Sequence, residues 1–459
     1  MKNILSTRVL IDFSAGSVYR YSDRDLEPCR VFGLVRLPYM RTLLFKIRQY
    51  ITEENRFGYR EWAEMPSNIL TTAAYIEKRG FTVDVEDRAT YENDFFRNYD
   101  VAAAWISIAD GLYEGLDYLR MAKLNGCRTV LVLFDDWAGM QEQVLRDYEF
   151  VDYGIRRWDI EVSLDRLLSS VLTGQSCEGP GLVYRREGQV IDGGELIQYQ
   201  DNLEHLGSAR RWLEALNPKT YQEFAIRVSS GCPFKCTFCH IADRDNRFRR
   251  VDDILDELES LPAGSFVRIL SSDMLQDAPW CRTFAEGIIS RRIDIQWETD
   301  SRFNWLTDLD LLKLLKRSGC VELAMGLESY NPQILKAIKK GYRLEQIDRG
   351  IENLNAVGIT PGVNMMIGHP LESSETLTAT ESFLRRVSPQ KVRLIGIQFL
   401  RPLPGTPVST EMAKLGLLDK PLTYRELYKS RDEPVSATHH LSIPQIVEWR
   451  SRLVAAYYS

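Results

Sequence analysis

Apolar and polar positions alternate in a strand–helix rhythm over the first third of the chain. Short apolar runs predict strands at residues 8–12, 81–86, 101–108, 128–134 and 150–155. Amphipathic stretches predict helices at residues 67–79, 112–124 and 140–147. Apolar strands that alternate with helices predict a parallel sheet covered on both faces, so we expect a doubly wound, Rossmann-like α/β domain over residues 1–175. Residues 15–65 break the rhythm and are predicted to be an insertion of that domain.

A second strand–helix series follows a connector at residues 176–220, which contains a predicted hairpin at 182–190. Strands are expected at residues 224–229, 266–271, 294–299, 321–326, 362–367 and 391–399. Six strand–helix units in succession predict a partial (β/α)6 TIM barrel over residues 221–407. The remainder, residues 408–459, is expected to be a small, mainly helical region.

Composition narrows the class of protein. The 459 residues carry a formal net charge of −6, with 44% hydrophobic and 27% charged residues, which is ordinary for a globular protein of several domains. Apolar runs are far shorter than the roughly 18 residues of a membrane-spanning helix, and no secretory leader is visible. We therefore expect a cytoplasmic protein without a membrane partner, and the acidic balance makes a nucleic-acid partner unlikely.

Three of the eight cysteines lie within eight residues, at Cys232, Cys236 and Cys239, directly after the first predicted barrel strand. Loops at this end of barrel strands hold active sites. Three thiolates at these spacings can surround one metal centre, and on a [4Fe-4S] cluster they would leave one iron open to another ligand. The alternative is a zinc site with His240 or a distant cysteine as the fourth ligand. The other five cysteines are scattered, which argues against a disulfide framework.

The cysteine segment, with Phe238 before the last cysteine, resembles the C-x3-C-x2-C motif of the radical S-adenosylmethionine (SAM) enzymes. Segments at the ends of the later strands resemble the same family in order, at residues 271–273, 297–302, 326–329, 364–370 and 398–407. The resemblance covers about residues 222–407.

This resemblance implies a [4Fe-4S] cluster bound by the three cysteines, and SAM bound on its open iron. Asp273 would hold the SAM amino group, Arg302 would face its carboxylate, and Glu328 would lie near its ribose. Further cofactor contacts are expected at Phe238, Glu298, Gly326, Ser329 and Asn364. A structural alternative pairs Glu328 with Lys336 or Lys339, and His240 and His369 could each face the cavity or be packed elsewhere.

The first domain resembles the cobalamin-binding domain found in one branch of the radical SAM enzymes. That resemblance implies cobalamin at the carboxyl edge of the sheet, near Ser107, Asp110, Gly111 and Asp135. The chain departs from the pattern in two ways, because no histidine precedes His205 and because Asp135 and Asp136 stand where the family usually has glycines. Glycine allows a backbone to approach a large ligand closely, whereas aspartate adds bulk and charge.

The resemblance thus implies a cobalamin-dependent radical SAM methyltransferase that acts on an unactivated carbon of a small molecule. Its SAM radical would abstract a hydrogen atom, and an electron donor such as flavodoxin or ferredoxin would reduce the cluster. One alternative is a radical SAM enzyme without cobalamin, which would catalyse a rearrangement, cyclisation or carbon–carbon cleavage. A second alternative is a non-catalytic metal-binding scaffold.

Overall fold

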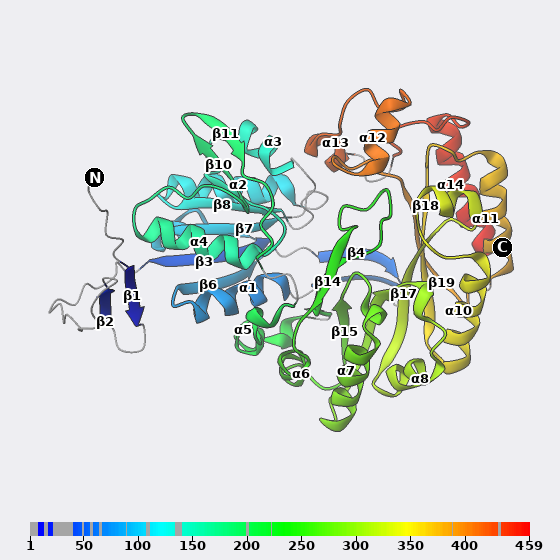
Figure 1. Cartoon of the computed structure of the whole chain (residues 1–459), viewed down its shortest axis with the longest axis horizontal. Helices are drawn as coiled ribbons and strands as arrows, with labels where there is room; N and C mark the ends of the chain where they lie inside the picture. Colours follow the sequence, from blue (N-terminus) through cyan, green and yellow to red (C-terminus); the bar gives the residue numbers. More distant parts are fainter. Residues whose placement is uncertain are drawn as a thin grey trace.

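The protein consists of two α/β units that lie side by side in the computed structural model (Figure 1). The structure describes residues 8–12, 17–21, 40–47, 50–55, 58–63, 67–88, 90–106, 111–133, 140–198, 202–221, 223–387, 389–429 and 433–459. Within these ranges no helix combines the length and the apolar composition needed to cross a bilayer.

A seven-stranded sheet forms the centre of the N-terminal unit. Its strand order is β11-β10-β9-β8-β7-β3-β6. The bounds are β3 (Arg41–Ile47), β6 (Thr82–Arg88), β7 (Val101–Ile106), β8 (Arg128–Leu133), β9 (Tyr153–Ile155), β10 (Leu182–Arg186) and β11 (Gln189–Asp192). The five strands β6, β3, β7, β8 and β9 are parallel to one another. Strand β10 pairs antiparallel with β9, and β11 pairs antiparallel with β10.

Helices cover both faces of this sheet, which confirms the doubly wound prediction. The apolar sides of α1 (Ser67–Lys78) and α4 (Ile160–Leu172) pack on one face. On the other face lie α2 (Leu112–Leu124) and α3 (Met140–Asp147). On the inner strand β7 all six positions are buried and apolar and alternate between the two cores, as expected for a strand covered on both faces.

Three features of the N-terminal unit differ from the sequence-based expectation. The predicted first strand, β1 (Arg8–Asp12), pairs with β2 (Ser17–Tyr21) in a separate hairpin. Strand β3, which lies inside the supposed insertion at 15–65, is instead an inner strand of the sheet, because its Thr-Leu-Leu-Phe run is buried on both faces. The predicted hairpin of the connector is β10–β11, and it extends the sheet rather than linking two domains.

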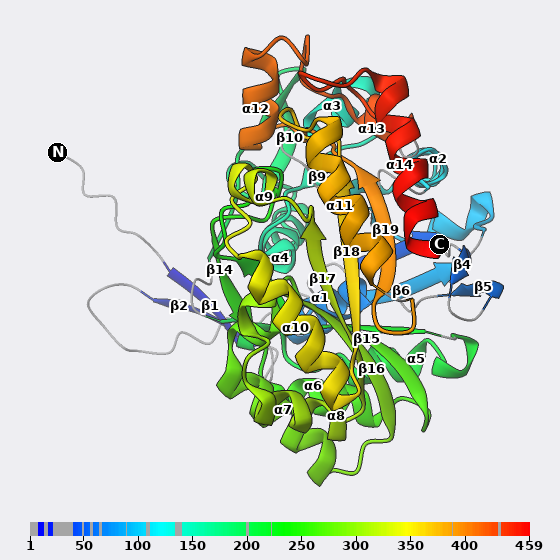
Figure 2. The same cartoon turned by 90° about the vertical axis from the view of Figure 1, so that its right-hand side faces the viewer.

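Six parallel strands in sequential order form the second unit, which confirms the predicted partial barrel. They are β12 (Phe224–Arg227), β15 (Ser265–Leu270), β16 (Ile295–Ser301), β17 (Cys320–Glu328), β18 (Thr360–Ile367) and β19 (Arg393–Phe399). Outside them lie α6 (Val251–Glu259), α7 (Ala278–Ser290), α8 (Leu309–Arg317), α10 (Leu344–Val357) and α11 (Ser374–Arg386), several of which Figure 2 shows in front of the sheet.

The remaining described elements are short or peripheral. They are β4 (Tyr50–Asn55), β5 (Gly58–Ala63), α5 (Arg210–Ala215), β13 (Ser229–Cys232), β14 (Arg244–Phe248), α9 (Pro332–Ala337), α12 (Pro407–Lys414), α13 (Tyr424–Lys429) and α14 (Ile443–Tyr458). The last helix packs against α11.

A buried ion pair joins the two units. Asp159 precedes α4 of the N-terminal unit, and its Oδ1 lies 2.8 Å from Arg247 Nη1 on β14, with the two side chains 0% and 4% exposed. The same carboxylate accepts a hydrogen bond from the backbone N–H of Gln198 at 2.7 Å. A second buried contact links Tyr221 Oη to Asp87 Oδ2 at 2.9 Å.

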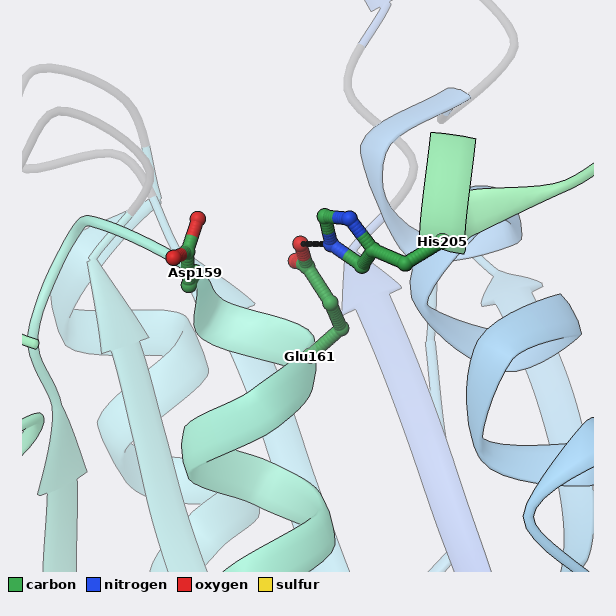
Figure 3. Close-up of side chains that lie close together, drawn as sticks. All are labelled: Asp159, Glu161 and His205. Carbon is green, nitrogen blue, oxygen red and sulfur yellow. Dashed lines mark hydrogen bonds and ion pairs between the residues drawn. The ribbon is translucent and has the colours of Figure 1, made fainter. Parts of the chain in front are cut away.

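Asp159 belongs to a group of three side chains at this junction (Figure 3). His205 Nε2 lies 2.9 Å from Glu161 Oε1, and one ligand atom of each of the three residues lies within 4.8 Å of the others. Burial alone would raise the pKa of Glu161, yet the hydrogen bond with His205 and the charge of Arg227 lower it. With Arg227 and Arg247 already balancing the two carboxylates, the group is better described as a charge network than as a cation site.

Replacing Asp159 with asparagine should destabilise the protein by about 3–5 kcal/mol, because Arg247 would stay buried without its counter-ion. Asparagine keeps the left-handed backbone of this position, where φ is 44°. Thermal and urea unfolding would measure the loss. The matched control is Glu178→Gln, which removes an exposed pair with Arg186 and should change stability by less than about 1 kcal/mol. An equal effect of the two variants would contradict this role of Asp159.

Candidate functional site

The three clustered cysteines lie on one loop at the carboxyl end of β12. Cys232 ends β13, which pairs with β14 in an antiparallel hairpin with an irregular register at this point. Gly231 has a φ of 101°, and a Cβ atom there would collide with the carbonyl oxygen of Asp245. Glycine is therefore required immediately before Cys232 for the loop to turn away from the sheet.

Backbone hydrogen bonds attach this loop to two distant elements. The N–H of Thr237 donates to the carbonyl of Ile338 after α9 at 3.1 Å, and the N–H of Val408 on α12 donates to the carbonyl of Thr237 at 3.0 Å. Phe238 packs against both apolar clusters of the protein, one shared by the N-terminal sheet and the barrel, and the other shared by the N-terminal sheet and residues 400–427. The loop is thus held from both sides of the partial barrel.

All three cysteines are free thiols in a largely buried setting. Cys232 and Cys236 are buried and Cys239 is partly buried. Burial raises the pKa of Cys232 and of Cys239, and each of these two thiols is affected by a neighbouring cysteine of the loop.

Opposite charges face the cysteine loop from the ends of neighbouring strands. Arg302, after β16, is buried with Nη1 3.6 Å from Cys236 Sγ, and its guanidinium lies 3.6 Å from the centre of the Phe234 ring. Asp273, after β15, is fully buried and accepts hydrogen bonds from Trp305 Nε1 at 2.8 and 3.0 Å. Burial raises the pKa of Asp273 to about 6, although the bonds from Trp305 and the charge of Arg302 oppose that rise.

A buried ion pair closes the same edge at β17. Glu328 Oε1 lies 2.8 Å from Lys340 Nζ, and the ammonium is 5.6 Å from the centre of the Phe238 ring. Although burial lowers the pKa of Lys340, the charge of Glu328 raises it above its usual range. A Cβ atom on Gly326 would lie 2.7 Å from Lys340 Nζ, so glycine makes room for the pair. The structural partner of Glu328 is therefore Lys340, and the expected pairing with Lys336 or Lys339 is wrong.

The other predicted barrel residues do not all lie beside the pair of Glu328 and Lys340. Asn364 is opposite Gly326 in the register of β17 and β18, beside the Glu328 pair. Ser329 lies apart, with its hydroxyl 3.4 Å from Thr380 Oγ1 of α11. Glu298 lies on β16 four residues before Arg302, below the level of the cysteine loop. His240 is next to the cysteine loop, where burial and the charge of Arg157 lower its pKa to about 3.

The carboxyl edge of the N-terminal sheet is turned toward the cysteine loop. Arg157 and Trp158 follow β9, and the charge of Arg157 affects both Cys239 and His240. A cavity of about 320 Å³ lies between this edge and the loop. It is lined by Trp158, Ile197, Pro233, Asp243, Arg244, Asp245 and Arg247.

Of the residues expected at the cobalamin edge, Gly111 is described, and its φ of 78° places it at the start of α2. Ser107, Asp110 and Asp135 lie outside the described residues.

Several residues of the site carried no signal in the sequence analysis. Trp305 and Asn246 both contact Asp273, the latter through a 2.9 Å bond from Nδ2 to the backbone carbonyl. Lys340 and Arg157 approach the cysteine loop from two different units. A position after a predicted sheet strand could have indicated Arg157, whereas the contacts of the other three depend on tertiary packing.

The turn after β18 carries two buried titratable side chains, those of Glu372 and His369. Glu372 Oε2 accepts the N–H groups of Gly368, at 2.5 Å, and of His369, at 3.2 Å. Burial raises the pKa of Glu372 to about 7 and lowers the pKa of His369 to about 4. His369 Nδ1 accepts from the N–H of Leu371 at 3.3 Å, so the ring is fixed within its own turn.

Known proteins are similar to this chain over the barrel alone or over both units. Residues 226–384 match the family model of the Radical SAM superfamily. Bacteriochlorophyllide d C-12(1)-methyltransferase of Chlorobaculum tepidum is 28% identical over 210 residues, which is 44% of this chain and 45% of that protein. An uncharacterized methyltransferase of Pyrococcus horikoshii is 25% identical over 328 residues, 69% of each chain. The chain thus spans less than half of the first relative and about two thirds of the second.

Another relative is the anaerobic magnesium-protoporphyrin IX monomethyl ester cyclase of Rubrivivax gelatinosus, 29% identical over 300 residues, 62% of this chain and 54% of that protein. Among solved structures, the radical SAM methyltransferase TsrM of Kitasatospora setae, with cobalamin and a [4Fe-4S] cluster bound, matches with a TM-score of 0.67 at 17% identity over 91% of this chain and 90% of its own. The cobalamin-dependent enzyme OxsB matches with a TM-score of 0.64 at 16% identity, over 83% of this chain and 55% of its own. The likeness to both structures concerns the fold.

Glu372 makes the stability of the protein depend on pH. Since its pKa is higher in the folded chain than in the unfolded chain, the folded state holds an extra proton between about pH 4.5 and pH 7, and stability should fall as the pH rises through that range. Glu372→Gln should remove up to about 3 kcal/mol of this dependence. The measurement is the melting temperature at pH 5 and at pH 7.5. Glu375→Gln, at an exposed position on α11, is the control and should leave the dependence intact.

Proposed function

We propose, on the premise that residues 226–384 form a radical SAM domain, that the chain is a cobalamin-dependent radical SAM methyltransferase acting on a carbon atom of a small molecule. Two of its relatives are named as methyltransferases, and the two similar structures are described with cobalamin. An electron donor such as flavodoxin or ferredoxin and a cytoplasmic location are part of this proposal.

One observation carries the proposal above the others. The carboxyl edge of the N-terminal sheet faces the cysteine loop, so that Trp158 after β9 and Pro233 of the loop line the same cavity. Ligands of open α/β sheets bind at this edge, and active sites of barrels lie at the carboxyl ends of their strands. A cofactor at the sheet edge and a reactive group on the barrel would therefore share one space between the two units.

The residues present fit the groups that this function requires. Cys232, Cys236 and Cys239 lie on one loop as free, largely buried thiols and would hold a [4Fe-4S] cluster. Beside them, Asp273 and Arg302 offer one negative and one positive group, which suits the ammonium and carboxylate of the amino-acid end of SAM. Bound together, these cofactors supply a 5′-deoxyadenosyl radical and, with cobalamin, a methyl group.

Protein groups around the cluster position this end of SAM and exclude water. Phe234 and Phe238 place aromatic rings beside the Arg302 guanidinium and the Lys340 ammonium. Trp305 holds Asp273 through both carboxylate oxygens and so fixes its direction. A dry, rigid setting of this kind keeps a reactive radical away from solvent.

Lys340 acts in this proposal as a positioning residue for Glu328. The carboxylate of Glu328 is on a residue with a φ of 66°, a strained conformation for a side chain other than glycine, and the ion pair holds it there. The carbonyl of Lys340 also accepts a hydrogen bond from Arg302 Nη2. Lys340 thus contacts both Glu328 and Arg302, which are expected to lie near the ribose and the carboxylate of SAM.

A second function is favoured by the relative named as a cyclase, which is similar over 62% of this chain. A ring-forming radical SAM enzyme would cleave SAM but would not move its methyl group to the product. SAM labelled in the methyl group separates the two functions, because the label enters the product in methyl transfer alone.

Anaerobic reconstitution tests the proposal directly. We expect about four irons per chain, cleavage of SAM to 5′-deoxyadenosine under reducing conditions, and a cobalamin spectrum that persists through gel filtration. Cys236→Ala should lose the cluster and the cleavage activity, whereas Cys281→Ala, a buried thiol of α7 away from the loop, is the control for cysteine loss in general. Zinc without SAM cleavage would reject the enzyme, and absence of bound cobalamin at saturation would reject its cobalamin dependence.

Lys340→Met should weaken SAM binding by at least about tenfold, since Glu328 would remain buried without its partner. The measurement is the dissociation constant of SAM on the cluster-loaded protein, together with the iron content. Lys336→Met, at an exposed lysine of α9 close in sequence, should leave both unchanged. Equal SAM affinity in the Lys340 variant and the wild type would show that the pair does not position Glu328 for SAM.

A further inference from the structure

A run of basic residues lies in the segment that leads from β17 to α10. Residues 329–344 contain no aspartate or glutamate, and their basic residues are Lys336, Lys339, Lys340 and Arg343. Lys340 is buried in its pair with Glu328, whereas the other three basic residues are exposed. Since the whole chain has a net charge of −6, this segment reverses the sign of the charge locally.

Backbone contacts hold this segment against the cysteine loop. The thiol of Cys236 donates a long hydrogen bond to the carbonyl of Lys339, with sulfur and oxygen 3.9 Å apart. In addition, the N–H of Thr237 donates to the carbonyl of Ile338 at 3.1 Å. Because Cys236 is buried and Lys339 is exposed, a single residue separates this sulfur atom from the protein surface.

The cysteine loop contributes a further exposed cation. Lys235 directly precedes Cys236, and its side chain is 68% exposed. Its Nζ lies 3.3 Å from Oδ1 of Asp243, which is 67% exposed, so water screens this ion pair strongly. The exposed cations beside the loop therefore form a basic patch, which consists of Lys235, Lys336, Lys339 and Arg343.

The charge and the place of the basic patch indicate the kind of partner that it fits. Exposed ammonium and guanidinium groups attract an acidic surface and repel a basic one, and such complementarity speeds association at low ionic strength. The phosphates of a nucleic acid would be attracted as well. However, closeness to Cys236 matters only to a partner that exchanges electrons with the centre on the cysteine loop, and an acidic redox protein meets both conditions.

We propose that the basic patch is the docking surface of an acidic one-electron carrier protein. This assignment rests on the proposed function and names the place where its reductant binds. In the docked complex the carrier loses one electron and the centre held by the three cysteines gains it, so no bond forms or breaks in this step. Docking over Lys339 brings the carrier closest to Cys236 among the three cysteines.

The test measures the dissociation constant of flavodoxin, an acidic one-electron carrier, on the cluster-loaded protein by calorimetry. Cytochrome c, a basic one-electron carrier, is the probe of opposite charge, and a short RNA duplex is the probe for nucleic acid. We expect flavodoxin to bind saturably, and to bind more weakly in about 0.15 M than in about 0.01 M salt, because the Debye length falls from about 30 Å to about 8 Å. Cytochrome c should not bind.

Removing three charges of the patch tests its residues. Lys336→Gln, Lys339→Asn and Arg343→Gln together should weaken flavodoxin binding by at least about tenfold at low salt. Asparagine is chosen for Lys339 because the backbone there is left-handed, with a φ of 53°. If this triple variant loses iron, Lys336→Gln with Arg343→Gln, which leaves the neighbour of Cys236 unchanged, is measured against the same tenfold criterion.

The matched control removes the same number of charges at the opposite edge of the barrel. Lys313→Gln, Lys316→Gln and Arg317→Gln change exposed residues of α8, which ends just before β17 begins. This control variant should bind flavodoxin as the wild type does. Equal affinity of the patch variant and the control variant, or tighter binding of the RNA duplex than of flavodoxin, overturns the proposal.

Dithionite distinguishes a failure of docking from a failure of the proposed function. This small reductant needs no docking surface, so the wild-type protein should cleave SAM with dithionite whether or not flavodoxin binds to the patch. Absence of that cleavage would reject the proposed function. Cleavage with dithionite, together with flavodoxin binding that ignores the patch, would reject the docking surface alone.

Discussion

The buried pair between Asp159 and Arg247 is an electrostatic contact on which the arrangement of the two units of this protein depends. Removing two charges from water is costly, and a buried pair is tolerated only where its geometry and its additional hydrogen bonds are good. Asp159 meets that condition through Arg247 and the backbone of Gln198. Because both partners lie at the junction, a shift of either unit would separate two buried charges. The pair therefore constrains the relative orientation of sheet and barrel.

That orientation places the carboxyl edge of the N-terminal sheet opposite the carboxyl edge of the barrel. The carboxyl edge of the N-terminal sheet ends in Arg157 and Trp158, and the carboxyl edge of the barrel carries the cysteine loop. Each edge alone is an ordinary ligand-binding location for its fold. The proposed methyl transfer would need both cofactors within one space, and Trp158 of the sheet edge and Pro233 of the cysteine loop line one cavity between the two units.

Strand–helix periodicity predicted the barrel well because each of its six strands is followed by a helix and pairs with the next strand in sequence. The same periodicity did not predict strand β3 of the N-terminal sheet. Strand β3 is separated from its neighbours in the sheet by a long segment without helical periodicity, so its Leu43–Phe45 run was assigned to an insertion. The β10–β11 hairpin was recognised, yet periodicity carries no information about which sheet a hairpin joins.

The amino-acid sequence was sufficient for the class of chemistry, because the three cysteines are local in sequence and, together with Phe238 and the later strand ends, resemble the motifs of one enzyme family. It was also sufficient for the approximate positions of Asp273 and Arg302, since the ends of parallel strands meet at one edge. Tertiary structure decided which groups complete the site. The partner of Glu328 is Lys340, and Ser329 contacts Thr380 of α11, because contacts between side chains depend on register and packing that bring distant residues together.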